Sequence, residues 1–221
     1  MEDILNFKPF VSKDFLPQEI YDVVYDAVNS QIAKNLAEGK DAYAEPFSKA
    51  VCENNGFIIL FECVPEYVYD FLKEKMSEAF GVKAARPNLL FARYTHDSGF
   101  APRLLPHADR AVKTQSITMT VELDSTLDWD IYVQDDRFKL EKNSAVFFSG
   151  SHQTHFRPHQ EFSKDDYYDI LLVQGPIDAP DQDEMTNENH FNDMDKRAGH
   201  FITKYSDVLE GSLKGAKNVN E

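Results

Sequence analysis

Two segments near the middle of the chain carry histidines at spacings that suit metal binding. In the first, His107 and Asp109 are separated by one alanine. Side chains two residues apart on an extended chain point to the same side, so this imidazole and this carboxylate can reach one ion. The second segment holds His152 and His155 and directly follows the apolar run 145–148. One histidine from it would complete a set of two imidazoles and one carboxylate, which leaves three positions open on Fe(II).

The chain has seven histidines, and a histidine–aspartate pair at this spacing is a weak signal by itself. A chain of this composition holds ~0.7 such pairs by chance. The alternative is a histidine and an aspartate that hydrogen-bond to each other in a turn. The context favours a metal site, because the pair falls between two predicted strands. The stretch from Asp109 to His155 is also long enough for two more strands that return the chain to its starting end.

The segments that must position these residues change in character along the chain. Apolar residues three and four positions apart predict amphipathic helices over 17–35 and 66–80, and the second of these begins after Pro65 and stops at Gly81. Short alternating or apolar runs predict strands, which are separated by turn-rich segments. The predicted strands span 7–13, 57–64, 88–94, 116–123, 128–133, 145–149 and 167–173.

This order of elements favours a mainly β fold with N-terminal helices, an antiparallel sandwich or barrel rather than βαβ units. The run 116–123 alternates between apolar residues on one face and Ser, Thr and Glu on the other. From residue 178 the chain turns polar and acidic, which predicts a loop or lid, a weak helix over 194–209 and a frayed tail. We therefore expect a single domain over 1–177, followed by an acidic C-terminal segment over 178–221.

Composition and charge narrow the classes of function. Hydrophobic residues make up 42% of the 221 residues and aromatics 13%, which suffices for a core and excludes wholesale disorder. The 23 basic and 38 acidic residues give a charge of −15, which disfavours nucleic acid and anionic membrane surfaces as partners. We expect no secretory signal at the N-terminus and no membrane span. The expected protein is cytoplasmic, with Cys52 and Cys63 as reduced, buried thiols.

Together these segments resemble the Fe(II)/2-oxoglutarate-dependent dioxygenases, the superfamily that includes the prolyl hydroxylases. The likeness covers most of the chain. FVSKDFLPQEIYDVV resembles the family's opening strand and first helix, FARYTHDSGFAPRLLPHADR its segment with the proximal ligands, SITMTVELD the strand that follows, and AVFFSGSHQTHFRP its distal-histidine strand. The resemblance implies a double-stranded β-helix, that is, a cupin-like jelly roll.

Matching the family's motif position by position assigns the metal ligands. His107 and Asp109 take the places of the proximal histidine and carboxylate. His155 takes the place of the distal histidine, because it lies seven residues beyond Phe148 and is followed by Phe-Arg-Pro. His152 is the competing distal ligand; if it does not bind the metal, it is placed to orient a ligand through a hydrogen bond.

The chain departs from the family where the 2-oxoglutarate carboxylate is usually anchored. The family has arginine or lysine at the start of the strand after the distal histidine, where this chain has Tyr167, with Lys164 three residues earlier. Arg157 is the preferred substitute, because it lies two residues after His155, faces the same side of the strand and can hold a carboxylate with two hydrogen bonds. The alternative for Arg157 is a surface ion pair. Tyr94 matches a family tyrosine near the co-substrate, and its alternative is a half-buried packing residue.

The resemblance implies an oxidoreductase that uses Fe(II), 2-oxoglutarate and O₂, with ascorbate left open as a further cofactor and no catalytic side chain beyond the metal ligands. Such a hydroxylase would form succinate and CO₂ while it oxidises an amino acid, a peptidyl residue or a small metabolite. Two rivals stand beside it. One is a non-catalytic β-sandwich binding module whose histidines are incidental, and the other is a cupin-like metalloenzyme that binds no keto acid.

Overall fold

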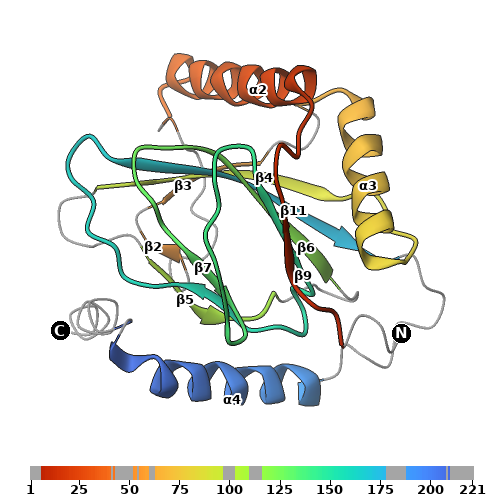
Figure 1. Cartoon of the computed structure of the whole chain (residues 1–221). Helices are drawn as coiled ribbons and strands as arrows, with labels where there is room; N and C mark the ends of the chain where they lie inside the picture. Colours follow the sequence, from red (N-terminus) through yellow and green to blue (C-terminus); the bar gives the residue numbers. More distant parts are fainter. Residues whose placement is uncertain are drawn as a thin grey trace.

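The computed structural model describes residues 6–40, 42, 52–53, 55–59, 63–96, 103–109, 116–177, 188–207 and 209. Within them, two antiparallel sheets lie against each other, with helices on the outside (Figure 1). The larger sheet has six strands in the order β1, β9, β6, β11, β4, β3. Their bounds are β1 Phe10–Ser12, β3 Asn55–Ile59, β4 Asn88–Thr95, β6 Ser116–Ser125, β9 Ala145–Phe148 and β11 Tyr167–Pro176.

The smaller sheet has five strands in the order β2, β5, β10, β7, β8. Their bounds are β2 Cys52–Glu53, β5 Arg103–His107, β7 Ile131–Val133, β8 Asp136–Phe138 and β10 His155–Arg157. The chain passes repeatedly from one sheet to the other, so that consecutive strands such as β9 and β10 belong to different sheets. This is a jelly roll, and the mainly β fold class predicted from the sequence is confirmed.

Two helices cover the outer face of the larger sheet, α2 at Gln18–Ala37 and α3 at Glu66–Phe80 (Figure 1). Both were predicted from apolar periodicity. As the sequence indicates, α3 begins directly after Pro65 and ends at Gly81, whose φ of 64° lies in the left-handed region that favours glycine. The fully buried side chains that join the helices to the sheet include Val24, Leu72, Met76, Val121 and Leu171.

Strand β6 is buried on both faces, and the two faces differ in chemistry. Its apolar residues belong to the core beneath the helices; they are Ile117, Met119, Val121 and Leu123. Its polar residues point to the space between the sheets and are equally inaccessible; they are Thr118, Thr120 and Glu122, which are 0%, 3% and 4% exposed. The clean alternation in the sequence therefore marks a helix-facing face and an inter-sheet face, and the inter-sheet face carries polar groups.

The smaller sheet is covered on its outer face by α4, at Glu188–Lys204 (Figure 1). Phe156 in β10 packs against Phe201 and Leu209 from this C-terminal region. The helix predicted over 194–209 is thus present but begins and ends earlier in the chain. The predicted lid over 178–187 and the predicted tail lie outside the described residues, and the domain boundary at 177 stays a prediction.

Residues 57–64 depart from the strand predicted there. Strand β3 ends at Ile59, residues 60–62 lie outside the described residues, and Cys63 sits in the turn that leads into α3. The prediction of a buried thiol is wrong for Cys63, because this residue lies in the exposed turn before α3 and not in a buried strand. Its Sγ is 3.6 Å from Oε1 of Gln31. No helix in the described part of the chain is long and apolar enough to span a membrane.

Candidate metal centre

The smaller sheet brings the two predicted histidine segments side by side. His107 is the last residue of β5 and His155 is the first residue of β10, and the two are directly paired in the antiparallel register. Asp109 lies two residues beyond the end of β5, where its backbone N–H donates to the carbonyl of Gly150 at 2.8 Å. Backbone hydrogen bonds thereby hold together segments that are more than forty residues apart in the sequence.

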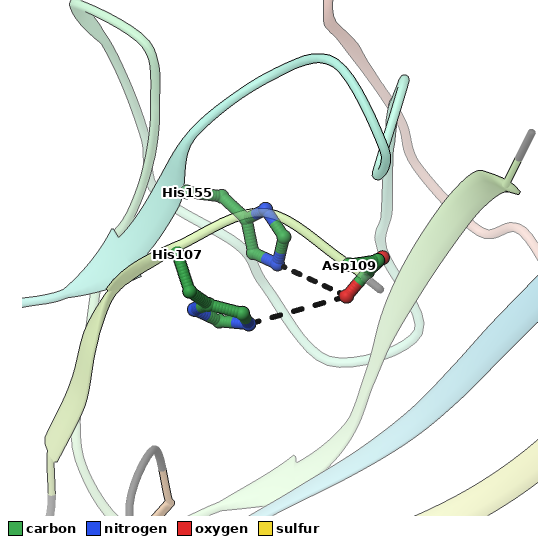
Figure 2. Close-up of side chains that lie close together, drawn as sticks. All are labelled: His107, Asp109 and His155. Carbon is green, nitrogen blue, oxygen red and sulfur yellow. Dashed lines mark ion pairs between the residues drawn. The ribbon is translucent and has the colours of Figure 1, made fainter. Parts of the chain in front are cut away.

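The three side chains converge on one point (Figure 2). Oδ1 of Asp109 lies 3.9 Å from Nε2 of His107 and 3.6 Å from Nε2 of His155. The three potential ligand atoms all lie within 4.8 Å of one another, and His155 is buried while the other two side chains are partly accessible. The structure therefore brings together the three residues that the sequence analysis assigned as ligands.

Backbone carbonyls fix which nitrogen of each imidazole faces the centre. Nδ1 of His107 is 2.8 Å from the carbonyl of Leu105, and Nδ1 of His155 is 3.1 Å from the carbonyl of Gln153. A carbonyl only accepts, so Nδ1–H donates to it and the Nε2 lone pair is left free. Both free lone pairs point toward Asp109 (Figure 2). Outer hydrogen bonds of this kind are how metal-binding histidines are usually oriented.

The carboxylate is oriented by a residue of the larger sheet. Thr118 donates its hydroxyl to Oδ2 of Asp109 at 2.6 Å, which leaves Oδ1 turned toward the imidazoles. The backbone of Gly150 lies close to Asp109 Oδ2 and Thr118 Oγ1. A Cβ at this position would lie 2.1 Å from both Asp109 Oδ2 and Thr118 Oγ1, so only glycine fits. The centre is therefore preorganised by contacts from both sheets.

Burial keeps the His107 imidazole in the form that binds a metal. Desolvation and the neighbouring His155, opposed by Asp109, together lower the pKa of His107 to about 4. At neutral pH the His107 ring is therefore neutral. Two imidazole nitrogens and one carboxylate oxygen are a donor set that fits Fe(II) with positions left over for other ligands.

His152, the competing distal ligand, lies elsewhere. It is buried, and its Nδ1 is 3.0 Å from Oγ of Ser149. It does not belong to the group of three ligand atoms found within the described ranges. The assignment of His107, Asp109 and His155 as metal ligands stays a prediction.

Arg157 lies on the same face of β10 as His155, in the space between the sheets. It is completely buried, and its guanidinium lies 5.1 Å from the ring centre of Trp129 and 4.6 Å from that of Tyr168. Nη1 donates to the carbonyl of Trp129. Nη2 has no hydrogen-bond partner among the described residues. A buried guanidinium with an unused donor is costly unless an anion completes it.

The other residues predicted to bind the co-substrate occupy different settings. Tyr94 is 2% exposed and makes an edge-on contact with Trp129, with ring centres 4.8 Å apart. Lys164 is exposed in the turn before β11. Tyr94 therefore contacts a ring that itself lies against Arg157.

Glu122 and Tyr168 were not singled out from the sequence. Tyr168 donates its hydroxyl to Oε2 of Glu122 at 2.5 Å, and both side chains are buried beside Arg157. Desolvation raises the pKa of Glu122 against the lowering effects of Tyr168, Ser125 and Arg157. The available signal was a glutamate on the polar face of an alternating strand, but it does not reveal which face is buried.

Comparison with known proteins supports the fold. No protein-family model and no curated protein matches the sequence. A solved prolyl-4-hydroxylase from Pseudomonas putida is similar with a TM-score of 0.52 and 14% identity, over 79% of this chain and 95% of that one. A prolyl 4-hydroxylase structure from Phytophthora capsici gives a TM-score of 0.53 and 11% identity, over 100% of this chain and 86% of that one. At these identities the likeness shows a shared jelly-roll fold of the prolyl-4-hydroxylase type.

Proposed function

We propose that the protein is an Fe(II)- and 2-oxoglutarate-dependent oxygenase that hydroxylates an amino acid, a peptidyl residue or a small metabolite. The observation that carries the proposal is the convergence of His107, Asp109 and His155 with both Nε2 lone pairs free. Bound Fe(II) would supply the oxidation of 2-oxoglutarate by O₂ to succinate and CO₂, with the second oxygen atom going to a substrate C–H bond. The shared fold with prolyl-4-hydroxylases supports this reaction class.

Arg157 is the residue proposed to hold the far carboxylate of 2-oxoglutarate. Residues two apart on a strand are separated by about 7 Å and point to the same face, so His155 and Arg157 can serve the two ends of one short diacid. The unused Nη2 donor of Arg157 supports this role. The keto-acid end would lie at the metal and the carboxylate end at Arg157, beside Trp129 and Tyr168.

The aromatic side chains around Arg157 would keep water away from this carboxylate. Trp129 meets Phe162 and Tyr168 edge-on, with ring centres 5.5 Å and 5.6 Å apart, and all three are buried. In such surroundings a charged hydrogen bond is stronger than in water. In this proposal the catalytic unit spans residues 1–177 and the protein acts in the cytoplasm.

An anaerobic titration tests the proposal. The protein is mixed with Fe(II) and then with 2-oxoglutarate, and metal retention and the visible spectrum are recorded. The expected result is stoichiometric iron and a weak charge-transfer band that appears only with the keto acid. A binding module would retain no iron. A cupin-like metalloenzyme would retain iron and show no band, and either result overturns the proposal.

A pair of variants separates the two candidate anchors. We expect Arg157→Gln to retain iron and to lose about 100-fold in 2-oxoglutarate affinity, because a buried charge-assisted hydrogen bond is removed. Lys164→Gln is the matched control and should bind the keto acid like the wild type, since Lys164 is exposed. The opposite pattern would move the anchor to Lys164.

A further inference from the structure

Four buried groups form what we call the inter-sheet cluster: Glu122 on β6, Trp129, Arg157 on β10 and Tyr168 on β11. None of them is more than 4% exposed. Tyr168 joins Glu122 to the face of the guanidinium, since its hydroxyl donates to Oε2 of Glu122 while its ring lies 4.6 Å from Arg157. A buried acid and a buried cation therefore share one small, water-poor space.

The charge of Arg157 is not neutralised by a direct ion pair with Glu122. No ion pair within 4 Å joins Glu122 to Arg157 among the described residues, whereas Glu122 is held by hydroxyl donors, Tyr168 on one oxygen and Ser125 on the other at 2.9 Å. The Nη2 donor of Arg157 stays unused. An incoming carboxylate thus finds an available donor, but it arrives next to a second carboxyl group.

Two carboxylates that share one buried cation cannot both stay ionised without a large electrostatic cost. Glu122 is the group able to respond. Burial already raises its pKa, and the exposed Asp128 nearby acts in the same direction, while Tyr168 and Arg157 act against it. Burial also raises the pKa of Tyr168, so the phenol keeps its proton and cannot absorb the change.

We propose that Glu122 takes up one proton when a carboxylate binds at Arg157, so that keto-acid binding by this protein is coupled to proton uptake. The inference rests on the proposed function and adds to it a positioning residue that is not a metal ligand. In the free protein Glu122 balances the charge of Arg157 from a distance. In the complex the ligand carboxylate replaces that balance, and Glu122 becomes neutral while Tyr168 still holds its side chain in place.

The sign of the coupling follows from linkage. Because the complex holds one proton more than the free protein, the dissociation constant rises by about tenfold per pH unit between the free and bound pKa values of Glu122. Protonation of the imidazole ligands works in the opposite direction, since it weakens binding as the pH falls. The two effects are therefore distinguishable by sign.

The single tryptophan of the chain is a built-in probe, because Trp129 is part of the inter-sheet cluster. The experiment titrates 2-oxoglutarate into anaerobic Fe(II)-loaded protein and follows Trp129 fluorescence across pH. Calorimetry in two buffers of different ionisation enthalpy counts the protons taken up. Between the free and bound pKa values of Glu122, the wild type should take up about one proton and its dissociation constant should rise about tenfold per pH unit.

Two variants locate the proton. Glu122→Gln keeps the hydrogen-bond acceptor for Tyr168 and should bind with no proton uptake and no rise of the dissociation constant with increasing pH. Asp128→Asn removes a neighbouring but exposed negative charge and should retain the uptake. Should Glu122→Gln fail to fold, the ligand-induced infrared difference spectrum of the wild type decides, because a protonated carboxylic acid band must appear.

Each outcome is decisive. Keto-acid binding without proton uptake in the wild type, or uptake that persists in Glu122→Gln, overturns the coupling and leaves the proposed function intact. The absence of a protonated carboxylic acid band has the same meaning. Iron-loaded protein that binds no keto acid at all overturns both the proposed function and the coupling.

Discussion

The two faces of the larger sheet treat buried charge in opposite ways. On the helix-facing side, Asp169 is completely buried and receives two hydrogen bonds from Arg93, at 2.7 Å and 2.6 Å. On the inter-sheet side, the adjacent residue Tyr168 lies against Arg157, whose guanidinium is only partly used. Strand β11 therefore contributes Asp169 to an ion pair on one face and, one residue earlier, the Tyr168 ring to the surroundings of Arg157 on the other.

This difference separates stability from binding. Both oxygens of the buried Asp169 carboxylate accept hydrogen bonds from the partly exposed Arg93, so this pair serves the fold. An arginine with an unused buried donor weakens the free protein and becomes favourable only when an anion arrives. The comparison predicts that substitutions on the helix-facing side change unfolding, whereas those on the inter-sheet side change metal and keto-acid binding.

The largest effect is expected from Gly150→Ala. The added methyl group would overlap Asp109 Oδ2 and Thr118 Oγ1 at 2.1 Å, so the carboxylate must leave its position. Iron affinity, measured by competition with a chelator, should fall more than about 100-fold, as expected when a ligand and its outer hydrogen bond are lost together. Gly199→Ala in α4 is the control, because nothing lies within 4 Å of its Cβ position. Unchanged iron affinity in Gly150→Ala would contradict the assignment of metal binding to the inter-sheet side.

Next in size is the loss of stability in Arg93→Met. It strands Asp169 without its cation, and the free energy of unfolding should fall by about 3 kcal/mol. Burial raises the pKa of Asp169, and Arg93 opposes that rise in the wild type. In the variant the folded protein holds the Asp169 proton more tightly than the unfolded chain does, so the loss of stability should grow as the pH rises above the ordinary aspartate value of 3.8. Denaturant unfolding at several pH values measures both effects.

Lys13→Met is the control for this prediction. It breaks the exposed ion pair between Lys13 and Glu141 and should change stability by less than about 1 kcal/mol. Keto-acid affinity should be normal in both variants. A large loss of keto-acid binding in Arg93→Met would mean that the helix-facing side also serves the ligand.

The smallest expected effect distinguishes the two faces of β6. Thr118→Val removes the hydroxyl that orients Asp109, and iron affinity should fall about tenfold with little change in unfolding. Its neighbour Met119 points to the helix-facing core, so Met119→Ala should lower stability by about 3 kcal/mol while iron affinity stays normal. If the two variants gave the same profile, the two faces would not be functionally distinct.

Local pattern in the sequence was enough for the scaffold. The periodicity of residues 17–35 and 66–80 predicted α2 and α3, and the alternation of 116–123 predicted β6. Strands β5 and β8 were not predicted, because three to five residues that include Arg or Pro give no period. Their extended form comes from pairing across the smaller sheet. Segments this short depend on tertiary context.

The candidate site divides in the same way. His107, Asp109 and His155 carry recognisable spacing, whereas Glu122 became visible only through the pairing of β6 with β11, two strands separated by more than forty residues. Arg157 was identified by its distance from His155, but the sequence cannot show that its guanidinium lies against two aromatic rings. Register and burial, which decide both facts, are properties of the assembled sheets.

The alternation of side chains along β10 links the proposed metal ligand His155 to the proposed anchor Arg157. His155 and Arg157 point inward, and Phe156 between them points outward to Phe201. A slip of β10 by one residue against β5 and β7 would reverse this alternation, turning Phe156 inward and expelling the proposed metal ligand and the proposed anchor together. Such a slip would abolish both proposed roles at once, so neither can be lost alone by a change of register.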